Sequence, residues 1–138
     1  MELSEIFEKQ AELNNIIMEK QKIQRVWPDD FLSVTDLSAN GDANHWLSKL
    51  STALKDEVRE LDEELLWKWW SKDSIDMQNI RVEIIDIFHF WISMAMAAGM
   101  TPADVERIYC QKYQVNIDRQ NNGYCAKTKT EDDNLRIS

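Results

Sequence analysis

The sequence predicts an all-α, four-helix-bundle-like fold, and three observations support this prediction. The chain of 138 residues contains only three glycines and two prolines, whereas Leu, Ile, Ala, Glu and Lys are abundant. Apolar residues recur at helical spacing over four long segments, and the strong helix breakers fall between those segments. This length suits a single domain, which we place at residues 1–125, followed at 126–138 by a polar tail that is expected to be flexible.

The first helix is predicted from Ser4, which would serve as its N-cap, to about Arg25. It must end before Pro28, because the residue ahead of a proline disfavours helical geometry. Residues 27–44 hold most of the breakers. We interpret them as a surface connection that is long enough to be functional.

Three further helices are predicted along the rest of the chain. The second covers about 45–70, and the third covers about 76–98 and stops at Gly99. The third is apolar on nearly every side, which in so small a chain predicts burial against a second subunit. The fourth covers about 101–119, with a threonine cap followed by Pro102 at the first helical position.

The overall charge excludes some functions and favours others. Against 25 Asp and Glu the chain has 16 Lys and Arg, giving a net charge of −9. Such an acidic protein is not expected to bind nucleic acid or a membrane surface. Cys110 and Cys125 lack metal-ligand spacing and are expected to be reduced thiols, which predicts a cytoplasmic protein.

Two pairs of carboxylates provide the main functional signal. Glu83 and Asp86 lie three residues apart on the most apolar helix. Burial of an unpaired carboxylate there would destabilise the folded protein by roughly several kcal/mol. Glu57 and Glu60 repeat this spacing on the preceding helix, so antiparallel packing would gather all four. Oxygen ligands favour Mg²⁺, with Mn²⁺ as an alternative, in a site that handles phosphates. Glu57 and Glu60 alone would be read as a solvated helix face.

Polar residues at helical spacing indicate two further candidate surfaces. Lys112, Asn116 and Arg119 share one helix face that could bind phosphate, although a solvated basic helix end would look the same. Gln10 and Asn14 are one turn apart and could pair with a nucleobase, although simple exposure is the commoner reading.

Four blocks of the chain resemble the dimeric all-α dUTPases, within the MazG-type class of nucleotide pyrophosphohydrolases. The blocks are QAELN at 10–14, DEVRELDEELLWKWW at 56–70, RVEIIDIFHFWIS at 81–93 and NIDRQNNGY at 116–124. The second and third blocks are shared with the wider class and imply the metal and the reaction. The first and fourth point more narrowly to dUTP.

Carried over position by position, this resemblance implies roles for individual residues. Glu57, Glu60, Glu83 and Asp86 would bind Mg²⁺, and Glu60, with Glu57, would orient or deprotonate the attacking water. The expected substrate-binding residues are Gln10, Asn14 and Trp46 for uracil, Phe90 for the deoxyribose, and Lys112, Asn116, Arg119 and Lys127 for the phosphates.

The expected reaction is Mg²⁺-dependent hydrolysis of dUTP to dUMP and pyrophosphate, with water attacking the α-phosphorus. One alternative is the same chemistry on dCTP or dGTP, and another is a helical regulatory or scaffold module without activity. The expected assembly is a homodimer. Because few residues separate the third and fourth blocks, a tetramer is a second possibility.

Overall fold

The structure is a computed structural model, and it describes residues 1–23, 42–123 and 131–138. Over these residues the secondary structure is helical and no strand is formed, which confirms the all-α prediction. The chain divides into two units, Met1–Met100 and Thr101–Ser138, and each is described by itself. The predicted end of the domain at residue 125 lies outside the described residues.

Helix α1 spans Leu3–Lys20 and differs from the prediction at both ends. Ser4 is not the cap: Glu2, two residues earlier, takes this position, and its N–H donates to the Glu5 carboxylate at 2.7 Å. The predicted end near Arg25 is also wrong. Lys22 adopts a φ of 52°, in the left-handed region, and this stops the helix.

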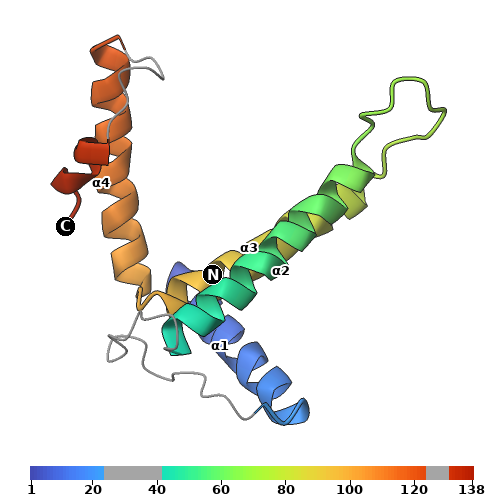
Figure 1. The fold of residues 1–138 in the computed structure, drawn as a ribbon, viewed down its shortest axis with the longest axis horizontal. Helices are drawn as coiled ribbons and strands as arrows, with labels where there is room; N and C mark the ends of the chain where they lie inside the picture. Colours follow the sequence, from blue (N-terminus) through green and yellow to red (C-terminus); the bar gives the residue numbers. More distant parts are fainter. Residues whose placement is uncertain (24–41, 124–130) are drawn as a thin grey trace. The chain divides into compact units, whose positions relative to one another are not determined.

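Helices α2, Asp42–Glu64, and α3, Met77–Ala97, form an antiparallel hairpin. Figure 1 shows them side by side, with the connecting loop at one end, and α1 also packs against α3. The prediction carried the second helix to Trp70, but it ends at Glu64. Although the Leu-rich and Trp-rich residues that follow tolerate helical geometry, the chain must reverse here so that α3 can pack along α2.

The ends of α3 follow the sequence signals closely. The Asp76 side chain caps the helix by accepting from the Asn79 N–H at 3.1 Å. Gly99, with φ of 78°, terminates it. Ile92 and Ser93 are the most deeply buried residues of this helix, which contacts α2 and α1.

The second unit consists of α4, Pro102–Asn121, and a short 3-10 helix, η3, at Glu131–Arg136. Thr101 caps α4 as predicted: its hydroxyl accepts from the Asp104 N–H at 3.2 Å. η3 packs against α4. Among the described residues, no single helix is long and apolar enough to span a membrane, although α3 and α4 taken as a pair pass by length and composition.

Candidate metal site and nucleotide pocket

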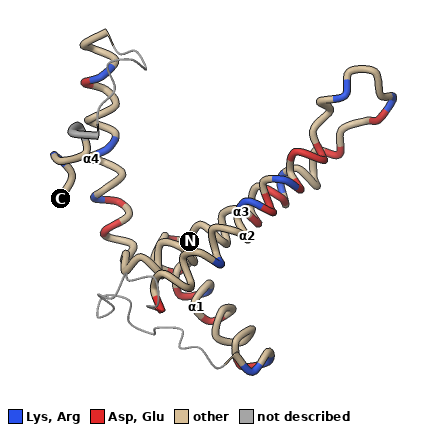
Figure 2. The backbone as a smooth tube through the Cα atoms, in the orientation of Figure 1, with Lys and Arg blue, Asp and Glu red and all other residues tan. Residues whose placement is uncertain are grey.

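Three carboxylates meet where α2 and α3 pack together. Glu57 and Glu60 project from successive turns of α2, and Glu83 projects from α3. One carboxylate oxygen from each lies within 4.8 Å of the other two. We call these three residues the carboxylate cluster. Within the hairpin, Figure 2 shows most of the acidic residues, together with some basic ones, on the half that adjoins the loop.

The carboxylate cluster suits a divalent cation. Oε2 of Glu57 and Oε2 of Glu83 are both buried without a hydrogen-bond partner. A buried acceptor without a donor is unfavourable, and so are three carboxylates at this distance. A cation would relieve both, and an all-oxygen donor set is the one that Mg²⁺ or Mn²⁺ prefers.

The pKa values of two cluster residues, Glu57 and Glu83, are raised, which shows that negative charge is unfavourable at this position. Burial raises the pKa of Glu57 from 4.5 to about 7, and the neighbouring charges of Glu60 and Asp86 add to the rise. Burial also raises the pKa of Glu83, again with Glu60 and Asp86 contributing. These carboxyl groups therefore hold protons more tightly than ordinary glutamates do, unless a cation replaces those protons.

The guanidinium of Arg59, on α2, lies near the cluster but pairs mainly with other carboxylates. Arg59 contacts Asp56 at 3.0 Å and Glu63 at 2.6 Å, while its distance to Glu60 is 3.9 Å. These exposed pairs are solvent-screened and weak. The guanidinium therefore does not supply the charge that the buried oxygens of Glu57 and Glu83 require.

Asp86 and Phe90 occupy successive turns of α3. Asp86 is not one of the three mutually close residues, but it is near enough to raise the pKa of both Glu57 and Glu83. Phe90 is half-buried. Residues four apart share a helix face, which places this ring one turn from Asp86.

Gln10 and Asn14 lie between α1 and α3 and are not simply exposed. Gln10 is 7% exposed, and its Nε2 donates to Asn14 Oδ1 at 2.9 Å. Asn14 Nδ2 donates to Ser93 Oγ at 3.1 Å, and His89 Nδ1 lies 2.5 Å from Gln10 Oε1. We call these four residues the amide network. His89 is thus hydrogen-bonded to α1 through Gln10.

The amide network adjoins a hollow of about 400 Å³ between α1 and α3. Its walls are mainly apolar, and Gln10, His89 and Lys9 supply polar groups. This combination of apolar walls and a few polar groups is typical of small-molecule sites. The lining residues are Met1, Ile6, Lys9, Gln10, Leu13, Ile85, Phe88, His89 and Ile92.

The predicted phosphate-binding residues belong to the second unit. On α4, Lys112 donates to Asn134 Oδ1 at 2.5 Å, and Asn116 is exposed. The predicted polar tail thus contributes a contact to this helix. Arg119 lies on the same helix, whereas Lys127 falls outside the described residues.

Asp118 lies on α4 between Asn116 and Arg119, and its negative charge is stabilised by two partners in the same unit. Gln114 donates to it at 2.9 Å and Arg136 pairs with it at 2.8 Å, and both contacts lower its pKa. Arg136 comes from η3. Arg136 was not among the predicted site residues, because its pairing with Asp118 depends on contacts between segments far apart in the sequence.

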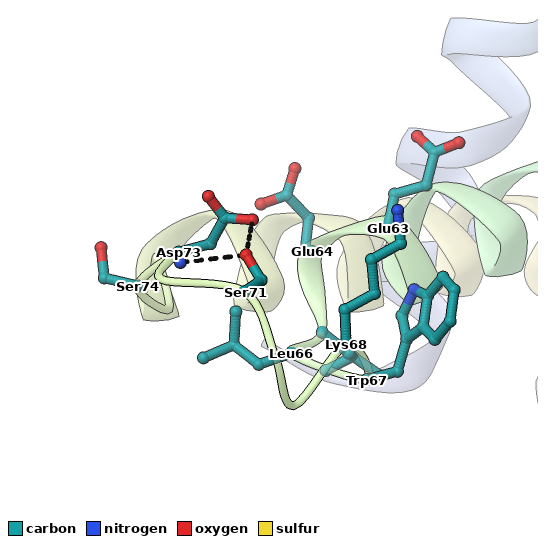
Figure 3. Close-up of a pocket in the computed structure, with 9 residues that line it drawn as sticks. Glu63, Glu64, Leu66, Trp67, Lys68, Ser71, Asp73 and Ser74 are labelled. Atoms are coloured by element: carbon teal, nitrogen blue, oxygen red, sulfur yellow. Dashed lines mark hydrogen bonds between the residues drawn. The ribbon is translucent and has the colours of Figure 1, made fainter.

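The hairpin loop carries three exposed tryptophans beside another hollow, of about 610 Å³ (Figure 3). Trp67, Trp69 and Trp70 are 64%, 87% and 62% exposed and meet edge to face. Lys68 Nζ lies 5.0 Å from the Trp67 ring centroid. Trp46, the weaker base-pocket candidate, is on α2 and packs edge to face with His45 at 5.1 Å.

These features define a class of protein: an all-α protein with a helical hairpin on which three carboxylates converge, a donor set that could bind a divalent cation. A family model described as dUTPase matches residues 2–103, which includes α1, α2 and α3. The chain therefore belongs to this all-α dUTPase family.

Individual relatives are more distant. The chain is 28% identical over 113 residues to the dCTP pyrophosphatase of Enterobacteria phage T4 and 29% identical to that of phage LZ5. Each alignment covers 64% of this chain and 66% of the relative, slightly under two thirds. A DNA replication protein of phage T4 is 26% identical over 101 residues, 55% of this chain and 26% of that protein. No solved structure matches the chain.

Proposed function

We propose that the protein hydrolyses a deoxynucleoside triphosphate to the monophosphate and pyrophosphate with Mg²⁺, and that dUTP is its substrate. The observation that carries this proposal is the carboxylate cluster, with its two buried oxygens that lack a partner. Membership of the dUTPase family supports the reaction and the choice of base.

In this mechanism Glu57, Glu60, Glu83 and Asp86 would hold the cation. When bound, Mg²⁺ supplies charge neutralisation for the triphosphate and lowers the pKa of water. A carboxylate oxygen of Glu60 accepts the proton of the water that attacks the α-phosphorus, and Glu57 orients that water. The bond from the α-phosphorus to the bridging oxygen breaks, and pyrophosphate leaves.

The remaining residues would bind the nucleotide. Gln10 and Asn14, with Trp46, would contact the base, and Phe90 would lie against the deoxyribose, where a 2′-hydroxyl would clash. Basic and amide groups would bind the phosphates. These phosphate-binding groups are Lys112, Asn116, Arg119 and Lys127.

Product analysis tests the reaction. Incubation with dUTP and Mg²⁺ should give dUMP and pyrophosphate in equal amounts, identified by chromatography, and a chelator should abolish turnover. Release of orthophosphate would contradict attack at the α-phosphorus. If neither product forms, calorimetry with Mg²⁺ and a non-hydrolysable dUTP analogue distinguishes the enzyme from an inactive scaffold, because a scaffold would not bind the analogue.

A second candidate substrate is dCTP, because two relatives carry the name dCTP pyrophosphatase. The two candidates differ in base recognition and share the chemistry at phosphorus. Measurement of kcat/KM for dUTP, dCTP, dTTP and dGTP under one set of conditions separates them. Our proposal requires dUTP to be the best of the four, and a preference for dCTP would transfer the assignment to the second candidate.

We also propose that the protein is a homo-oligomer, with a dimer expected and a tetramer as the alternative. Residues on α1 and α3 that would normally be buried are exposed in the single chain: Leu13, Ile16, Ile17, Val82, Ile84, Ile85, Phe88 and Trp91. Light scattering should show a dimer or larger assembly, and Ile84→Glu should weaken it. Ile75→Glu in the hairpin loop is the matched control. A monomeric wild-type protein would contradict the proposal.

A further inference from the structure

In the amide network, each hydrogen bond determines which atom of the next side chain donates and which accepts. The Ser93 hydroxyl donates to the His89 carbonyl at 3.1 Å, so its oxygen is free to accept from Asn14 Nδ2. Asn14 therefore turns its Oδ1 toward Gln10, whose Nε2 donates to it. Gln10 Oε1 then faces His89 Nδ1. Because that oxygen only accepts, Nδ1 must carry the proton.

Each amide in this chain of hydrogen bonds retains unused capacity. A primary amide has two N–H donors and two acceptor lone pairs. Gln10 uses one of each within the network and keeps one of each, and so does Asn14. If the amides were reversed, the remaining donors and acceptors would exchange places. The orientation of Gln10 therefore determines which hydrogen-bonding pattern the hollow between α1 and α3 presents.

Uracil and cytosine differ by this kind of exchange. The N3 and C4 positions of uracil present an N–H donor and a carbonyl acceptor, whereas those of cytosine present a nitrogen acceptor and an amino donor. A freely rotating amide satisfies either base, and a fixed amide satisfies one. A site that leaves a buried polar group unpaired discriminates strongly against the wrong ligand.

We infer that His89 and Ser93 are positioning residues that fix the amide orientations of Gln10 and Asn14, and so determine which pyrimidine base the protein accepts. This inference rests on the proposed function and deepens it. In this inference His89 acts through Gln10 and does not contact the reacting atoms. Its role is to donate from Nδ1, and that of Ser93 is to accept from Asn14 while donating to the helix backbone.

The test compares His89→Leu, which removes the donor, with His89→Asn, whose side-chain N–H can take the place of Nδ1–H. The readout is kcat/KM for dUTP divided by kcat/KM for dCTP, with Mg²⁺ present. His89→Leu should reduce the preference for one base about tenfold, so that the ratio moves toward one, and the change should come mainly from KM. His89→Asn should retain much of the wild-type preference. Ser93→Ala, a small change, should move the ratio in the same direction.

The outcomes separate this inference from the proposed function. If the wild type hydrolyses no deoxynucleotide, the proposed function is wrong. The preference between the two bases is then measured by calorimetry, as the ratio of the dissociation constants of non-hydrolysable dUTP and dCTP analogues in the presence of Mg²⁺. An unchanged ratio in both His89→Leu and Ser93→Ala would overturn the inference. So would an equal loss of kcat/KM on both nucleotides, which would indicate a purely structural role. A wild type that does not distinguish the two bases would also overturn it.

Discussion

Glu60→Gln is expected to lower kcat for dUTP hydrolysis by about a thousandfold, with the fold intact. The change keeps the size of the side chain but removes the oxygen that accepts the proton of the attacking water, and general-base catalysis contributes on the order of 10²–10⁴. It also removes one carboxylate from the group whose oxygens lie within 4.8 Å of one another. Steady-state rates of pyrophosphate release at saturating Mg²⁺ measure the effect.

Glu63→Gln is the matched control for this change. Glu63 lies on the same helix, and its side chain is 66% exposed in a pair with Arg59. Because an exposed pair contributes little, stability should change by less than about 1 kcal/mol and kcat should stay close to that of the wild type. If Glu60→Gln retained more than a tenth of the wild-type rate, Glu60 would not be the base.

The metal-free protein should become less stable as the pH rises from about 4.5 to about 7. Burial raises the pKa of Glu57 to about 7 from 4.5, so in this range the folded protein binds more protons than the unfolded chain. Stability must then fall with pH. A rise of this size corresponds to about 3 kcal/mol at most, and solvent screening of this partly exposed group reduces the expected loss to on the order of 2 kcal/mol. The loss should be absent below pH 4.5 and complete about one pH unit above 7. Urea unfolding in the presence of a chelator measures it.

Mg²⁺ should reverse this loss, because a bound cation favours the ionised carboxylates. The stabilisation by Mg²⁺ should therefore be larger at pH 8 than at pH 5. Glu57→Gln should flatten the pH dependence and reduce the Mg²⁺ effect, whereas Glu12→Gln, at an exposed position on α1, should change neither. A metal-free protein whose stability rises between pH 5 and 7 would show that Glu57 is not destabilised by burial.

Local signals in the sequence predicted much of the fold. Thr101 was expected to cap a helix and Gly99 to end one, and the structure places α3 and α4 within two residues of the expected bounds. The spacing of Glu57 and Glu60 predicted that both would share a face of α2. These features depend on residues three or four apart, so the sequence can determine them without knowledge of the rest of the chain.

The tertiary structure decided what depends on distant residues. The end of α2 at Glu64, the donation of Asn14 to Ser93 and the pairing of Arg136 with Asp118 each arise from segments that meet only after folding. Local helix propensity at 65–70 was overridden, since the packing of α3 along α2 requires the chain to turn. The sequence by itself determined which carboxylates were available, and the packing of the helices determined that Glu83 would meet Glu57 and Glu60. The reason is that side-chain spacing is a property of one helix, whereas convergence is a property of the interface between two.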